Sequence, residues 1–221
     1  MRGLDAAGHA AEHGTFAARC RTLYLEQRMR LLPSSVARRA PIACETWESA
    51  LPTASADERL GIHDTYSVPL LGAEAPGSLV ARALAVLLRY DVFPPHRMRH
   101  HVCTPDATLR PDALVVQRVI AGPLAVEAAV RVTDVFDERA SDGHAGFSYV
   151  TLQGHVERGV ATFSVGLDAA GAPTFRIESW SRPGTALLSA ARPFLRRMQR
   201  RSVHEALSYV QQRVSESASE R

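Results

Sequence analysis

The ten residues from Gly146 to His155, GFSYVTLQGH, carry side chains that are well suited to proton transfer. Aromatic, hydroxyl and imidazole groups on a strand that ends in a Gly-His turn indicate a site as well as a core. The Tyr149 phenol can donate a hydrogen bond to a substrate carbonyl or ketal oxygen, although a buried tyrosine is more often a core residue with a satisfied hydroxyl. His155 and Glu157 either form an acid–base pair or are solvated residues of the turn.

Two carboxylates elsewhere in the chain are further candidates for acid–base chemistry. Asp134 has the parity of the apolar even positions 124–132, so an ideal strand aims it at the apolar side, where burial raises a carboxyl pKa. If the strand ends or bulges there, Asp134 is solvated instead. Glu178 shares its parity with Trp180. If that side faces a cavity, a carboxylate lies beside an aromatic wall; if not, Glu178 pairs with Arg176 or Arg182.

These patterns predict a cavity with proton-transfer groups and lining residues. The predicted proton-transfer residues are Asp134, Tyr149, Glu178 and His155. The predicted substrate-binding residues are Phe147, Thr151, Phe163, Trp180 and Arg131.

Metal and cofactor chemistry finds little support in the sequence. His96, His100, His101 and Cys103 form the densest metal-like cluster. After a Pro-Pro pair, however, an extended chain puts the first two on one face and the last two on the other, so one face supplies too few ligands. The chain has no lysine and no GxSxG, HExxH or phosphate-loop motif, which excludes Schiff-base and Walker-type chemistry. We therefore predict neither a metal nor a cofactor.

The charge pattern argues against a nucleic-acid partner. The formal net charge is only +3, with 26 basic residues against 23 acidic ones. Four of the arginines, Arg196, Arg197, Arg200 and Arg201, form a strip on the last predicted helix that suits a phosphate, an anionic lipid or RNA. The same spacing opposite an apolar stripe is typical of any surface helix. The predicted partner is a hydrophobic small molecule, and homodimer formation is an open alternative.

The periodicity predicts an α+β fold. A broad apolar face indicates a helix over 77–90, and a long amphipathic helix is expected over about 193–215. Between them the period changes to two, which is typical of half-buried antiparallel strands. The strands are expected at 114–120, 124–136, 146–152, 159–167 and 174–180. We predict a curved antiparallel, barrel-like sheet that grips the long C-terminal helix, with an irregular helical N-terminal extension.

The predicted domain boundary lies near Pro69. Residues 1–68 are expected to form an extension with a disordered start, a loose helix over 15–32 and an irregular wrap, and 69–221 the ligand-binding domain. The three cysteines lack any CxxC pattern and indicate buried or free thiols of a reducing cytoplasm. We see neither a signal peptide nor a membrane span and expect a cytoplasmic protein.

The segment from Pro69 to Val210 resembles the domain-of-unknown-function family 1990. The resemblance rests on FPPHRM at Phe93 to Met98, on the strand around Gly146 to His155, and on Ser181-Arg182-Pro183. It implies a helix-grip fold of the START and Bet v 1 type, whose curved sheet encloses an apolar ligand cavity. One departure is that the family's Gly-Glu-Glu segment reads Gly159-Val160-Ala161 here.

The resulting functional hypothesis is a cofactor-free protein that binds a hydrophobic molecule and shapes it by acid–base chemistry. Cyclisation or isomerisation of a polyketide-like intermediate, including spiroacetal formation as in antibiotic biosynthesis, suits such a cavity because the pocket holds the reactive conformer. The alternatives are a non-catalytic carrier or sensor with the same cavity, and an interaction module that uses the arginine face of the last helix.

Overall fold

The computed structural model describes residues 30–59, 61–140, 143–184 and 192–219. The strands of this part of the chain are β1 (Arg30–Pro33), β2 (Ile62–Pro69), β3 (Met98–Val102), β4 (Leu114–Ala121), β5 (Leu124–Asp137), β6 (His144–Thr151), β7 (Glu157–Leu167) and β8 (Pro173–Pro183). The helices are α2 (Ser34–Arg39), α3 (Pro76–Leu88) and α5 (Arg192–Ser219). The strands form one antiparallel sheet in the order β2-β8-β7-β6-β5-β4-β3, and β1 pairs with β5 outside this path.

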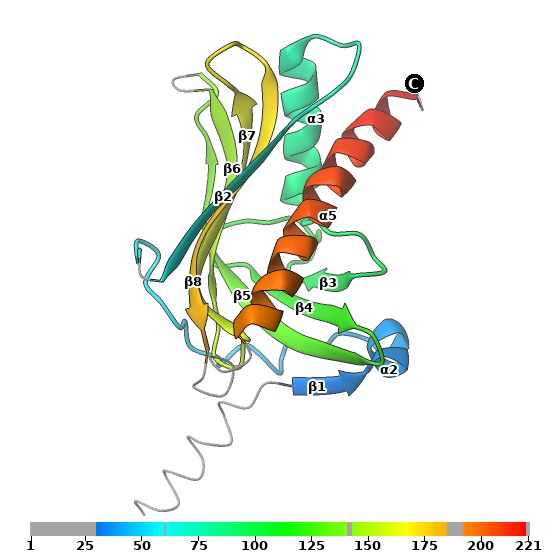
Figure 1. Cartoon of the computed structure of the whole chain (residues 1–221), viewed down its shortest axis with the longest axis vertical. Helices are drawn as coiled ribbons and strands as arrows, with labels where there is room; N and C mark the ends of the chain where they lie inside the picture. Colours follow the sequence, from blue (N-terminus) through cyan, green and yellow to red (C-terminus); the bar gives the residue numbers. More distant parts are fainter. Residues whose placement is uncertain (1–29, 60, 141–142, 185–191, 220–221) are drawn as a thin grey trace, which may run out of the picture.

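The sheet curves around the long helix α5, as Figure 1 shows. α5 runs diagonally across the concave face, and α3 packs beside its C-terminal half. This arrangement confirms the predicted α+β fold, in which a curved sheet grips a C-terminal helix. The five strands and two helices predicted from periodicity are all present, with ends shifted by a few residues.

Period-two alternation builds the core on the concave side. Phe147, Phe163 and Phe175 are almost fully buried on three neighbouring strands, and the first two stack with ring centroids 5.0 Å apart. Among the side chains of α5 that the structure describes, Ala206, Leu207, Val210 and Val214 are buried and apolar. None of the helices in the described ranges is long and apolar enough to cross a membrane.

Several elements between 30 and 102 differ from the predictions. The stretch expected as an irregular wrap ends in a regular edge strand, β2, whose residues alternate between half-buried and exposed and pair with β8. Arg30 to Leu32, predicted as the end of a helix, belong to β1; residues 15–29 of that helix lie outside the described part. β3, by contrast, confirms the extended chain predicted after the Pro94-Pro95 pair.

Residues 30–53 lie against the outer face of β4 and β5, where an ion pair is buried. The Arg118 Nε donates to Glu127 Oε2 at 2.7 Å, and both side chains are at most 5% exposed. Glu127 also accepts from Arg30 and, at 3.3 Å, from the Trp47 indole. The Arg118 guanidinium donates to the carbonyls of Ala40 and Pro41, so both charged groups have partners from the covering segment.

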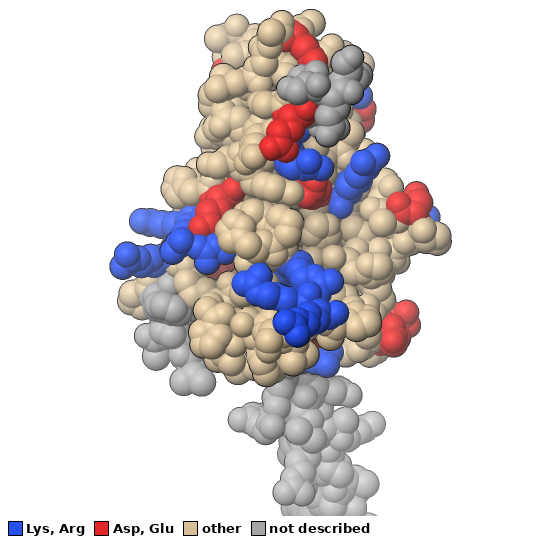
Figure 2. Space-filling model, turned by 90° about the vertical axis from the view of Figure 1, so that its right-hand side faces the viewer, with Lys and Arg blue, Asp and Glu red and all other residues tan. Residues whose placement is uncertain are grey.

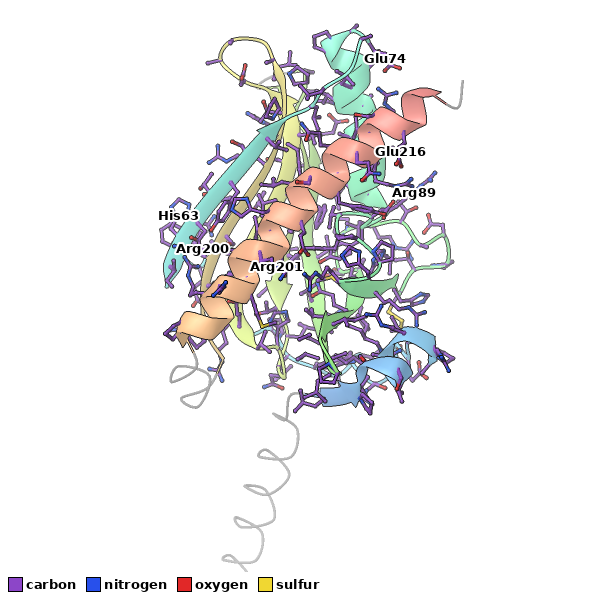
Figure 3. The ribbon with its side chains drawn as sticks, turned by 45° about the vertical axis from the view of Figure 1, so that its right-hand side comes forward. His63, Glu74, Arg89, Arg200, Arg201 and Glu216 are labelled. Atoms are coloured by element: carbon purple, nitrogen blue, oxygen red, sulfur yellow. A yellow bond between two sulfur atoms is a disulfide. The ribbon has the colours of Figure 1, made fainter. Side chains whose placement is uncertain are left out.

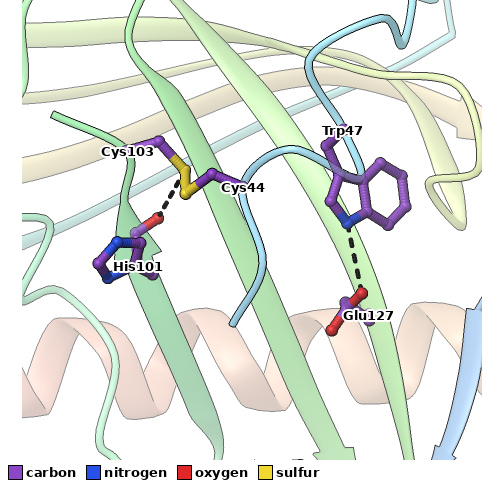
Figure 4. The surroundings of a disulfide bond; sticks show 5 residues. All are labelled: Cys44, Trp47, His101, Cys103 and Glu127. Carbon is purple, nitrogen blue, oxygen red and sulfur yellow. Dashed lines mark hydrogen bonds between the residues drawn. A yellow bond between two sulfur atoms is a disulfide. The ribbon is translucent and has the colours of Figure 1, made fainter. Parts of the chain in front are cut away.

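A disulfide between Cys44 and Cys103 corrects the prediction of free thiols (Figure 4). The two Cα atoms are 6.0 Å apart although 59 positions separate the residues in sequence. Spacing within the sequence could not reveal this pair, because it depends on how residues 30–53 pack over the sheet. The two cysteines therefore give no support to a reducing compartment; Cys20 lies outside the described residues.

Replacing Arg118 with Met should lower the free energy of unfolding by about 3 kcal/mol, because it leaves the buried Glu127 carboxylate without its main partner. Arg176→Met, which removes an exposed partner of Glu178, should change it by less than about 0.5 kcal/mol. Urea denaturation of both variants tests this. An Arg118→Met protein as stable as the wild type would show that the buried pair does not hold the covering segment.

Candidate functional site

A cavity of about 210 Å³ lies between the concave face of the sheet and the first half of α5. Its walls are mainly apolar and come from β3 to β8, from the β6–β7 turn and from α5. The apolar lining residues are Phe93, Met98, Val119, Ala121, Val126, Ala128, Val156, Val160, Ala161, Phe163, Ile177, Met198 and Val203. A volume of this size holds a small ligand of one or two rings, since a cavity of about 150 Å³ already binds benzene.

Strand alternation explains which side chains reach the cavity. Tyr149 and Thr151 on β6 face the same side as Ala161 and Phe163 on β7. On β8 the inward positions are Ile177, Ser179 and Ser181. Small residues at several of these positions leave the space that larger side chains fill elsewhere in the core.

The polar groups at one end of the cavity come from the turn between β6 and β7. His155 and Glu157 both line the cavity. Gly154 has φ +88°, a left-handed conformation that favours glycine. Gly159 lies so close to β8 that a Cβ would come within 1.9 Å of the Trp180 carbonyl oxygen. Thr151 Oγ1, which accepts from the Gly159 amide at 3.0 Å, fixes this turn to the end of β6.

Glu157 is a half-buried carboxyl with an unusual protonation equilibrium. Burial raises its pKa to about 7; the nearby Arg196 charge lowers it and the Asp64 charge raises it further. Gln199 on α5 donates to Glu157 Oε2 at 3.3 Å. A carboxyl with this pKa exchanges a proton near neutral pH, as a general acid or base requires.

Arg196 does not neutralise Glu157 because it is engaged elsewhere. Its guanidinium binds both carboxylate oxygens of Asp64 on β2, with Nη2 2.9 Å from Oδ1. Nη1 also donates to Gln199 Oε1 at 2.9 Å, which orients the amide that contacts Glu157. Arg196 lowers the pKa of Asp64 through this hydrogen-bonded pair.

His155 is held neutral beside Glu157. Burial lowers its pKa to about 4, and a hydrogen bond with the Glu157 backbone opposes this only in part. Its Nδ1 lies 3.1 Å from the Glu157 nitrogen and 3.0 Å from the Glu157 carbonyl oxygen, which fixes the ring. The site therefore combines a neutral imidazole with a carboxyl that titrates near pH 7.

The structure brings four of the predicted site residues to the cavity. Tyr149, His155, Thr151 and Phe163 line it. Phe147 stacks on Phe163 as part of the buried core and does not line the cavity.

The other four predicted residues lie outside the cavity. The register shifts between Val132 and Asp134 by a β-bulge, which breaks the parity argument and leaves Asp134 exposed. Glu178 pairs with His63 and Arg176 on the outer face of the sheet. Of the two alternatives for Glu178, the structure therefore shows the ion pair and not the cavity wall.

Trp180 and Arg131 belong to the same outer face. Trp180 has the parity of Glu178, and its ring stacks on His63 with centroids 4.2 Å apart. Arg131 donates to the backbone carbonyls of Asp112 and Glu48. Neither residue contributes to the lining of the cavity.

Sequence reasoning misses Gln117 and Gln199 and leaves Glu157 out of the predicted site. The sequence presents Glu157 only as a turn residue, either paired with His155 or solvated, because its burial depends on α5 lying above it. Gln117 interrupts an otherwise largely apolar strand, LVVQRVIA, and a glutamine at such a position is the signal in the sequence for a buried polar group. In the structure its side chain is 3% exposed.

The arginines of α5 do not act as one basic strip. Arg196 binds Asp64 and Arg201 binds Glu205, while Arg197 and Arg200 are exposed. Figure 3 shows Arg200 and Arg201 on the outer side of the helix. On the face drawn in Figure 2 the basic side chains form separate groups with acidic residues between them.

Within the described ranges, the side-chain ligand atoms of Cys44, His101 and Cys103 lie within 4.8 Å of one another. The disulfide uses both sulfur atoms, and a disulfide offers no thiolate to a metal. His100, from the same predicted cluster, packs against the Tyr90 ring instead.

The sequence matches the family model described as "Domain of unknown function (DUF1990)" over residues 61–209. This confirms the resemblance seen in the central strand and in Ser181-Arg182-Pro183. No curated protein matches the chain.

Solved structures with similar folds include the following three, given with their sequence identity, TM-score and the share of each chain that is covered. TTHA0849 from Thermus thermophilus is 11% identical, with a TM-score of 0.49, covering 69% of this chain and 95% of that chain. The hypothetical protein jhp0584 from Helicobacter pylori is 8% identical, with a TM-score of 0.45 and coverage of 78% and 94%. A norcoclaurine synthase from Thalictrum is 11% identical, with a TM-score of 0.44 and coverage of 68% and 92%.

Glu157→Gln should stabilise the protein above pH 7. The folded state keeps the Glu157 proton up to about pH 7, whereas the unfolded chain releases it near 4.5, so wild-type stability falls as the pH rises through that window. The variant should match the wild type below pH 4.5 and exceed it at about pH 8 by on the order of 2 kcal/mol. Denaturant titrations at both pH values measure this, and parallel pH profiles would contradict it.

Proposed function

The chain belongs to the family described as Domain of unknown function (DUF1990), and we propose that this member binds a small hydrophobic molecule beneath α5 and transforms it by general acid–base chemistry. The observation that carries the proposal is the position of Glu157. Its carboxyl is half-buried on the wall of an apolar cavity and is held there by Gln199.

The reaction class follows from what the cavity offers. An apolar enclosure selects one conformer of a flexible ligand, and Glu157 moves one proton in that conformer. Ring closure or isomerisation needs no more than this, with no external cofactor. Cyclisation of a polyketide-like intermediate, including spiroacetal formation, is such a reaction, and the ligand portion inside the cavity is limited to about two fused rings.

The competing function is a carrier that uses the same cavity without chemistry. It shares the apolar walls but gives the Glu157 carboxyl no role in binding or turnover. The two functions differ in whether a ligand in the cavity changes the protonation of Glu157, which makes pH the useful variable.

Binding of tetralin, an uncharged two-ring hydrocarbon, tests the cavity directly. The chain has four methionines, and Met98 and Met198 both line the cavity. With ¹³C-methyl methionine, tetralin should shift these two methyl signals. Ala128→Phe or Val203→Phe, which fill the cavity from β5 and from α5, should abolish the shift, whereas Ala81→Phe on the exposed side of α3 should not.

The pH dependence of tetralin binding tests the role of Glu157. A hydrocarbon that displaces water raises the carboxyl pKa further, so binding should be about three- to tenfold weaker at about pH 8.5 than at about pH 5.5. The charged and titratable groups around Glu157 are Arg196, Asp64, His155 and Tyr149.

The matched variants are Glu157→Gln, which should remove the pH dependence, and Glu178→Gln on the outer face, which should keep it. Binding that is equally strong at both pH values would show that the ligand does not contact Glu157, and would contradict the acid–base function.

A further inference from the structure

Gln117, Tyr90 and Tyr149 form a polar cluster at the wall of the cavity that Glu157 also lines. Gln117 Nε2 donates to the Tyr90 hydroxyl at 2.6 Å, and both side chains are almost fully buried. The Tyr90 ring lies next to the Tyr149 ring, with centroids 6.5 Å apart. Of the two tyrosines, only Tyr149 lines the cavity.

The direction of the hydrogen bond between Gln117 and Tyr90 follows from its chemistry. An amide nitrogen only donates, so the Tyr90 oxygen accepts from Gln117. Tyr149 lines the cavity, so its hydroxyl can donate a hydrogen bond to a ligand there.

Tyr90 is held in place at a conformational cost. It follows the end of α3 with φ +56°, in the left-handed region that a bulky residue seldom adopts. Its ring packs against Phe147 at 5.7 Å and His100 at 5.3 Å. The Asp91 amide donates to the Val86 carbonyl at 3.1 Å, so this conformation closes the C-terminal end of α3.

The donor and the carboxyl lie apart on the same cavity. Tyr149 pairs with Ala161, which is four residues beyond Glu157 on β7, so about 13 Å of strand separates the two positions. Both side chains line the cavity, so a ketone bound there can meet both groups. Burial and the Glu157 charge raise the Tyr149 pKa, so the phenol stays protonated and remains a donor.

We infer that the cavity takes a small ketone and that Tyr149 and Glu157 together interconvert it with its enolate. This inference rests on the proposed function and names its substrate class. Glu157 removes a proton from carbon next to the carbonyl, or conjugated with it. The C–H electron pair forms a carbon–carbon double bond, and the carbonyl π pair moves to oxygen. The enolate oxygen accepts the Tyr149 hydrogen bond, and Glu157 returns the proton to carbon.

Deuterium exchange into 2-tetralone in D₂O tests this step without knowledge of the natural substrate. The ketone has the two-ring frame of tetralin, and each exchange event reports one proton abstraction. The wild-type protein should accelerate exchange next to the carbonyl above the buffer rate, as followed by proton NMR. Bound 2-tetralone should also show a carbonyl stretch shifted to lower frequency by the Tyr149 hydrogen bond.

Three tyrosine variants separate chemistry from packing. Tyr149→Phe should slow exchange by about 10²- to 10³-fold and remove the carbonyl shift, as expected for loss of a donor to an oxyanion. Tyr90 acts as a positioning residue, so Tyr90→Phe should cost about three- to tenfold and weaken the shift. Tyr209→Phe, which removes a hydroxyl bonded to Asp91 outside the cavity, should leave both unchanged. Glu157→Gln should abolish the acceleration while tetralin still binds.

The outcomes distinguish this inference from the function on which it rests. Tetralin binding without accelerated exchange, or exchange that Tyr149→Phe does not alter, overturns the ketone–enolate assignment and leaves the cavity function standing. If neither tetralin nor 2-tetralone binds, both proposals fail. Acceleration that depends on Tyr149 and Glu157 but not on Tyr209 supports both.

Discussion

The ion pair between Arg196 and Asp64 is the contact on which the candidate site depends. It joins the first turns of α5 to the edge strand β2, and so places Met198, Gln199, Ser202 and Val203 over the concave face. Because the guanidinium is bound to Asp64, it does not neutralise Glu157, and burial keeps the pKa of that carboxyl high. One ion pair thus holds the helix that covers the cavity and keeps the nearest guanidinium from pairing with Glu157.

The two faces of the sheet are covered in different ways, and the cavity lies on only one of them. On the outer face, the buried Arg118–Glu127 pair and the Cys44–Cys103 disulfide attach residues 30–53 to the sheet. On the inner face, alanines and serines leave space under α5. The contacts that attach the covering segment therefore lie on the face away from the candidate site, where burial raises the Glu157 pKa.

Periodicity predicted most of the fold because it depends on local alternation. The five strands from 114 to 180 and the two long helices follow from apolar spacing alone. β2 was missed because its inward side reads Ile62, Asp64, Tyr66, Val68, and the aspartate interrupts the apolar pattern. That aspartate is the partner of Arg196, so the residue that hid the strand is the one that the site requires. The disulfide was missed for a related reason, since its two cysteines meet only after the sheet has formed.

The candidate site shows where parity succeeds as a guide and where it fails. Tyr149, Thr151 and Phe163 were placed correctly on one face because β6 and β7 are regular there. Asp134 was misplaced by one β-bulge, which reverses the direction of every later side chain on the strand. Glu157 lies at the start of β7 and is covered by α5, whose Gln199 is 42 positions away in sequence, so no local pattern reveals its environment. Charged residues in turns next to a predicted strand therefore merit consideration as site residues whenever a distant amphipathic helix can cover them.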